Sequence, residues 1–167
     1  MTLKKIFKPR PSSGWVSVSV IALVLLGSGL YYLLTTGFSG PYMLMILLTV
    51  PLGIVFLLIA VFFPTMHYEI EGTRLTLVYG PLLRYVIDID QIKSIRRRDL
   101  KISLLSSFRF PGLAIFSVPY GEIGSVRMCA TAASTDILLI ETGSTRYGLT
   151  PADEAEFVAE LRSRMKQ

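Results

Sequence analysis

Two long apolar runs open the chain, and neither contains a charged residue. Residues 16–34 read VSVSVIALVLLGSGLYYLL, and residues 42–63 read YMLMILLTVPLGIVFLLIAVFF. As helices they would reach about 28 and 33 Å, which matches a hydrocarbon core of about 30 Å. The connection between them, TTGFSGP, is so short that it forces an antiparallel pair. The pattern therefore predicts a transmembrane helical hairpin.

A different pattern begins near residue 64. Apolar and polar residues alternate in short runs separated by Gly, Pro and Ser, which is typical of antiparallel strands. In RLTLVY, for example, Leu75, Leu77 and Tyr79 form one face, and the residues between them form the other. Roughly seven or eight such strands predict an antiparallel sandwich or a partly open barrel.

The end of the chain changes to a helical pattern over residues 151–166. Phe157 and Leu161 belong to an apolar stripe, and acidic residues come early while basic residues come late, which suits the helix dipole. Thr150 is the expected N-cap and forms a capping-box-like pair with Asp153. We therefore predict a helix that packs one face on the strands.

These segments divide the chain into three parts. We expect a basic tail over residues 1–15, the hairpin over residues 16–63, and one folded domain over residues 64–167. The last part has enough residues to form a compact core of its own.

Strands followed by one carboxy-terminal helix are the plan of the pleckstrin-homology (PH) fold, and three runs make a family resemblance specific. They are YEIEGTRLTLVYGPLLRYVIDIDQIKSIRR, FRFPGLAIFSVPYGEIGSVRMCAT and DILLIETGSTRYGLTPADEAEFVAEL, in that order. Over residues 68–161 the chain resembles bacterial PH domains. The resemblance implies a mainly-β PH-like domain capped by its helix, and members of such families often follow membrane spans. It indicates a fold and does not by itself indicate an activity.

The charge is distributed unevenly along the chain. The net charge is +5, and four basic residues with no acidic residue precede the first apolar run. From residue 64 onward there are 13 basic and 12 acidic residues. Proteins that bind nucleic acid usually carry a basic domain or a basic face, so this division argues against a nucleic-acid partner.

The same basic tail predicts the orientation. Basic residues flank the first span and none lie in the hairpin loop, so the amino terminus and the domain should face the cytoplasm. We expect a two-span protein of the bacterial cytoplasmic membrane. A cleaved signal peptide is the alternative, but the apolar run exceeds the usual 7–15 residues and no clear A-x-A site follows it. The single cysteine, Cys129, fits a reducing compartment.

Candidate catalytic groups are few. His67 is the only histidine and lies at the exit from the second apolar run, and Cys129 lies in the middle of a predicted strand. Asp88 and Asp90 would share a face of an extended strand, where ion pairs with nearby arginines explain them better than paired catalytic acids do. We therefore expect no enzyme activity, no metal site, no cofactor and no small-molecule substrate.

Basic residues gather in one later stretch of the chain. The candidate lipid- or partner-facing residues are Lys93, Arg96, Arg97, Arg98, Lys101 and Arg109. In an extended strand, Arg96 and Arg98 share one face and Arg97 takes the other, so the three cannot all be buried.

Three interpretations of this stretch stay open. The first is a solvated edge strand whose charges discourage edge-to-edge pairing. The second is a surface held against anionic lipid, where each basic residue contributes about 1 kcal/mol. The third is a specific headgroup pocket. Eukaryotic phosphoinositide-binding relatives place basic residues in the loop between the first two strands. Here that loop is short and acidic and consists of Glu71 and Gly72.

The expected function is a non-enzymatic, membrane-anchored module that binds a protein partner or assembles with copies of itself at the inner face of the membrane. One alternative is the sensing of anionic lipid by the basic stretch over residues 93–101. Another is an auxiliary subunit of a transport or secretion complex that docks through the hairpin. The small residues of the first span suit close helix packing; they are Ser17, Ser19, Gly27, Ser28 and Gly29.

Overall fold

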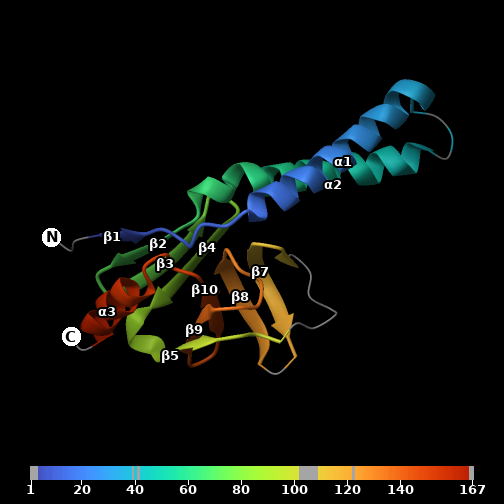
Figure 1. Cartoon of the computed structure of the whole chain (residues 1–167). Coiled ribbons are helices and arrows are strands. Elements are labelled where there is room, and N and C mark those ends of the chain that lie inside the picture. The colour runs from blue at the N-terminus through green and yellow to red at the C-terminus, as the bar shows by residue number, and fades with distance from the viewer. Residues whose placement is uncertain (1–3, 39, 41, 102–108, 122, 166–167) are drawn as a thin grey trace.

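Figure 1 shows a computed structural model of the chain, in which two long helices project from a domain of two sheets and a third helix. The structure describes residues 4–38, 40, 42–101, 109–121 and 123–165. Two stacked sheets with a terminal helix and no closed barrel confirm the predicted PH-like sandwich.

The two apolar runs form α1 (Gly14–Thr36) and α2 (Tyr42–Phe62), which pack side by side as the predicted antiparallel hairpin. Both are long and apolar enough to cross a membrane, and only 17% of each apolar window is buried within the protein. A continuous apolar surface of this kind favours lipid as its surroundings.

Glycines allow the two helices to approach closely. A Cβ atom on Gly53 would lie 2.8 Å from Cγ of Leu26, and one on Gly29 would lie 2.5 Å from Cγ2 of Val50. Gly27, which was expected to contribute as well, has no atom within 4 Å of such a Cβ. The close contact therefore depends on Gly29 and Gly53.

The first sheet lies next to the hairpin. Its strands, in the order β1-β2-β3-β4, are all antiparallel. They are β1 (Lys5–Phe7), β2 (His67–Glu71), β3 (Arg74–Tyr79) and β4 (Leu83–Asp88). The 3-10 helix η1 (Phe63–Thr65) connects α2 to β2, and η2 (Ile89–Gln91) follows β4.

The second sheet has the order β5-β9-β10-β8-β7-β6. Its strands are β5 (Ile92–Arg98), β6 (Arg109–Phe110), β7 (Leu113–Tyr120), β8 (Gly124–Ala130), β9 (Ile137–Thr142) and β10 (Arg146–Leu149). β8 and β10 are parallel, so the expectation of antiparallel strands throughout was wrong for this one pair.

The core between the sheets is apolar with one buried polar cluster. Leu75, Leu77 and Tyr79 are fully buried, as the alternation in RLTLVY predicts. In the cluster, Tyr68 Oη donates to the Cys129 carbonyl at 2.8 Å and accepts from the backbone N–H of Thr150 at 3.1 Å. Burial raises the pKa of Tyr68, so the hydroxyl keeps the proton that it donates.

The carboxy-terminal helix α3 (Glu154–Met165) begins later than predicted. Asp153 Oδ1 accepts from the backbone N–H of Glu156 at 2.9 Å, so Asp153 caps the helix. The prediction that Thr150 is the cap was wrong because its buried hydroxyl instead accepts from the backbone N–H of Thr131 at 2.8 Å.

The segment before α1 is part of the domain and is not a separate tail. β1 pairs with β2 in the register Lys5↔Ile70 to Phe7↔Tyr68. The Phe7 side chain is buried, and its ring meets that of Phe157 on α3 edge-on, with the centroids 5.2 Å apart. This strand therefore completes both the first sheet and the core beneath α3.

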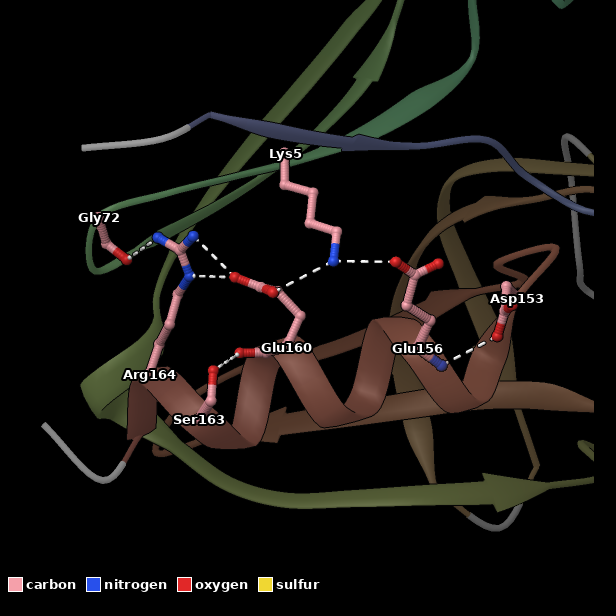
Figure 2. A network of polar contacts seen from close by, with 7 residues as sticks. All are labelled: Lys5, Gly72, Asp153, Glu156, Glu160, Ser163 and Arg164. Carbon is pink, nitrogen blue, oxygen red and sulfur yellow. Dashed lines mark hydrogen bonds and ion pairs between the residues drawn. The ribbon is translucent and has the colours of Figure 1, made fainter. Parts of the chain in front are cut away.

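Ion pairs attach β1 to α3, and a hydrogen bond attaches the β2–β3 turn to the same helix (Figure 2). Lys5 Nζ lies 2.9 Å from a Glu156 carboxylate oxygen and 3.3 Å from one of Glu160. Arg164 donates through Nε to Glu160 at 2.7 Å and through a terminal nitrogen to the Gly72 carbonyl at 3.1 Å. α3 thus holds both the amino-terminal strand and the β2–β3 turn.

The base of the hairpin packs directly against the domain. Tyr79 Oη donates to the Ile59 carbonyl of α2, and the rings of Phe56 and Phe110 lie 5.4 Å apart. On α1, Ser17 Oγ donates to the Pro111 carbonyl at 3.3 Å. These contacts fix the orientation of the hairpin relative to the sheets.

We predict that Phe7→Ala lowers the free energy of unfolding by about 3–5 kcal/mol, because it removes a buried ring from the contact with Phe157. Urea unfolding of the full chain in detergent micelles measures the change. Ile6→Ala is the matched control, because Ile6 belongs to the same strand and is 57% exposed. Equal effects of the two substitutions would contradict the role given to Phe7.

The ion pairs around β1 predict a dependence of stability on pH. A hydrogen bond from Lys4 lowers the pKa of Glu69, and hydrogen bonds from Arg164 and then Lys5 lower that of Glu160, from the ordinary value of 4.5. Groups with a lowered folded-state pKa stabilise the fold above pH 4.5, and this contribution is lost as the pH falls through the folded value. We expect a smaller loss between pH 6 and pH 3.5 in Lys4→Gln/Lys5→Gln than in the wild type, measured by urea unfolding. The same loss in both proteins would show that these pairs contribute nothing.

Candidate functional site

The predicted arginine stretch forms β5, at the edge of the second sheet. Within the described part of the chain, β5 pairs with β9 alone, so its other backbone edge has no partner strand. The register shifts between Ile92 and Ser94, a bulge that interrupts the start of the strand. The three arginine side chains are exposed. β5 is therefore an edge strand with exposed charges, as the first interpretation predicts.

Arg97 faces α3 and contributes to a groove between that helix and β5. It donates to Asp136 through Nε at 2.9 Å and through a terminal nitrogen at 2.8 Å. The groove has a volume of about 470 Å³, and its other lining residues all come from α3; they are Glu154, Ala155, Val158, Ala159 and Arg162. Its lining thus combines two alanines and a valine with two arginines and one glutamate.

The helix runs antiparallel to β5 along this groove. Its first turns lie near Arg97 at the end of β5, and its last turns contact η2, which precedes β5. The opposite face of β5 carries Arg96, whose charge lowers the pKa of Glu141 after the larger effects of hydrogen bonds from Ser94 and Arg146. Cationic side chains therefore flank the open edge on both faces of the strand.

The remaining basic residues of the predicted set lie elsewhere. Lys93 lines a second hollow of about 200 Å³ beside the β9–β10 turn, together with Glu141 and Arg146. Lys101 follows β5 and is exposed. Arg109 begins β6, at the opposite edge of the same sheet, and its side chain lies outside the described residues. The backbone therefore does not bring Arg109 to the β5 edge.

The groups considered for catalysis have structural surroundings. His67 Nδ1 lies 2.6 Å from the Thr65 carbonyl and Nε2 lies 2.9 Å from Glu69. Cys129 is fully buried, and burial raises its thiol pKa to about 12. Asp88 and Asp90 do not share an extended strand, because β4 ends at Asp88 and η2 follows.

Reasoning from the sequence missed the part of the site that α3 contributes. Ala155 and Ala159 are small and exposed, and Arg162 is one of the late basic residues that suit the helix dipole. The spacing of Ala155 and Ala159 by four residues places them on one helical face. This pattern in the sequence could have indicated the contribution of the helix to the groove.

The comparison with known families gives one match. The sequence model of the bacterial PH domain family covers residues 66–165, which is more than half of the chain. The chain belongs to the bacterial PH domain family. Neither the curated proteins nor the solved structures contain a significant match.

The family match covers β2 to α3, including the β5–α3 groove, and does not cover the amino-terminal segment. PH domains are generally non-catalytic interaction modules. The family match starts at Met66, so β1 and the hairpin lie outside it. In this protein the segment before α1 pairs with the first strand of the matched region.

Proposed function

We propose that this protein is a non-enzymatic, membrane-anchored PH-domain protein that binds an extended acidic segment of a partner protein along the open edge of β5. The observation that carries the proposal is the groove between β5 and α3, where an unpaired strand edge lies beside apolar side chains, two arginines and Glu154. An extended segment can add to such an edge through main-chain hydrogen bonds, while alternate side chains enter neighbouring pockets.

The arginines of the groove can pair with an acidic occupant, in competition with Asp136, which Arg97 already contacts, and with Glu154. A strand added to β5 would direct alternate side chains towards Arg97 and Arg162 on the α3 side and towards Arg96 on the other side. Hydrogen bonds between guanidinium groups and carboxylates are about twice as strong as neutral ones. The small side chains of Ala155 and Ala159 leave space for the side chains of the added strand.

The same charges disfavour assembly with a second copy through this edge. Pairing two β5 edges would bring two arginine clusters together, and like charges directly opposite each other destabilise a pair of strands. The bulge after Ile92 further limits regular pairing at that end. The edge is thus protected against copies of itself while it stays complementary to an acidic strand.

We expect a photoreactive amino acid at Ala159 of the full chain, expressed in its host cells, to form an adduct with a partner protein. The crosslinked segment should be rich in Asp and Glu. Arg97→Glu/Arg162→Glu should weaken the adduct at least about tenfold, because charge-assisted hydrogen bonds become repulsive contacts. Immunoblotting and mass spectrometry measure the yield and identify the segment. Both arginines are exposed, so the free energy of unfolding should change by less than about 1 kcal/mol.

Two controls make this experiment decisive. The same photoreactive group at Val86, which is 51% exposed on β4, should give no such adduct. Arg74→Glu/Arg84→Glu makes the same change of charge on the first sheet and should leave the Ala159 adduct intact. An adduct of two copies of this chain, or one that survives Arg97→Glu/Arg162→Glu, would rule out the proposed occupant.

Membrane insertion with both ends in the cytoplasm is the second part of the proposal. The pairing of β1 with β2 supports it, because that pairing requires the amino terminus and the domain to lie on the same side of any membrane that the hairpin crosses. The basic residues before α1 favour the cytoplasmic side.

We predict that an impermeant thiol reagent added to intact cells labels Phe38→Cys in the hairpin loop and labels neither Ile6→Cys nor Ser163→Cys. Each variant is made with Cys129→Ser, and permeabilised cells should allow all three sites to react. Labelling of Ser163→Cys in intact cells would place the domain outside. Opposite results for Ile6→Cys and Ser163→Cys would contradict the β1–β2 pairing in the membrane.

A further inference from the structure

A second groove lies where the hairpin joins the domain. One wall is formed by residues 8–12, which lead into α1, and the other by residues 63–67, which leave α2. Its volume is about 470 Å³, within the range of about 300–1,000 Å³ that is usual for small-ligand sites. No part of the wall that precedes α1 belongs to the family match.

The position of this groove relative to a membrane follows from its walls. Residues 8–12 end two positions before Gly14, where α1 begins, and residues 63–67 start directly after Phe62, where α2 ends. A bilayer that the two helices cross must therefore have one of its headgroup layers at the height of the groove. This holds for either orientation of the hairpin.

The groove combines an apolar wall with cationic groups. Phe63, Pro64 and Met66 contribute apolar surface. Lys8 is exposed, and none of the contacts found among the described residues involves its ammonium group. Arg10 lies 3.7 Å from Asp136 and 3.9 Å from Glu154, which is longer than the 2.7–2.9 Å typical of a charge-assisted hydrogen bond.

Asp136 and Glu154 partly balance the charge of Arg10, whereas Lys8 has no acidic partner among the described residues. Glu69 is the carboxylate next to His67 on β2, and it lies 2.8 Å from Lys4 and 2.9 Å from His67. Its charge is therefore already balanced outside the groove. Lys8 therefore gives the mouth of the groove a positive charge, and Arg10, whose carboxylate contacts are long, adds a guanidinium that can also pair with an anion.

We propose that this groove binds the headgroup of an anionic phospholipid from the surrounding leaflet. Lys8 and Arg10 contact the phosphate, and the glycerol end of the lipid lies against Phe63, Pro64 and Met66. The apolar wall and the position beside two lipid-facing helices favour a lipid over a soluble phosphate, which would gain nothing from that wall. The lining residues of this site differ from those of the β5–α3 groove, although Arg10 contacts both Asp136, the partner of Arg97, and Glu154, which lines that groove.

The only tryptophan of the chain, Trp15, reports on this site. It lies in the first turn of α1, three residues after Ser12 of the groove wall, and it is 51% exposed. Bromine-labelled lipids quench tryptophan fluorescence on contact. The full chain is placed in phosphatidylcholine nanodiscs that contain a low, equal mole fraction of either bromine-labelled phosphatidylglycerol or bromine-labelled phosphatidylcholine.

We expect brominated phosphatidylglycerol to quench Trp15 more strongly than brominated phosphatidylcholine, which corresponds to a local enrichment on the order of tenfold. Lys8→Gln/Arg10→Gln should make the two lipids equivalent. Lys8→Gln alone should reduce the excess; it leaves all described side-chain contacts in place and decides the outcome if the double variant does not fold.

The matched control is Lys93→Gln/Arg96→Gln, which removes the same charge from β5 and should keep the excess quenching. Equal quenching by the two lipids in the wild type would overturn the proposal. A loss of the excess in the control variant would do the same, because it would indicate attraction by the overall charge. Relief of the quenching by added inorganic phosphate would assign the groove to a soluble anion instead.

Discussion

The pairing of β1 with β2 is the constraint on which the arrangement of this protein depends. It joins Lys5 to Ile70, so the whole hairpin becomes a loop whose two ends are fixed on the first sheet. Closing a long loop costs conformational entropy, although the cost rises slowly with length. Burial of Phe7 against Phe157 and the ion pairs of Lys5 with α3 offset that cost. Without this strand, the groove at the base of the hairpin would lose one of its walls.

The sequence predicts the features that depend on local patterns. The two helices follow from charge-free runs, and the strands of the domain follow from alternation and turn residues. β1 could not be predicted, because three residues are too few for a period and the partner strand lies beyond two spans. The cap of α3 was misplaced for a related reason. Thr150 and Asp153 are both good caps, and only the burial of Thr150 against Thr131 decides between them.

The candidate site also has one part that the sequence predicts and one part that it does not. The charged edge was predictable, because consecutive arginines in an extended strand cannot all be buried. The groove beside it was not, because it arises from the antiparallel packing of α3 along β5 and from residues as inconspicuous as Ala155 and Ala159. Arg109 illustrates the converse error. It is close to the arginine stretch in sequence, and the strand order places its backbone at the far edge of the sheet.

If the hairpin crosses a bilayer as proposed, the contact between Phe110 and Phe56 has a consequence for the bilayer thickness that suits this protein. It lies two turns before the end of α2, so the domain covers one side of the helix from Phe56 onward. The 14 residues of α2 before Phe56 extend about 21 Å, while a typical hydrocarbon core is about 30 Å thick. On that side the leaflet has to thin, or the β6–β7 turn has to lie among the first carbons of the acyl chains. Both solutions cost less in a thin or easily compressed bilayer, so the junction would favour such regions of a membrane.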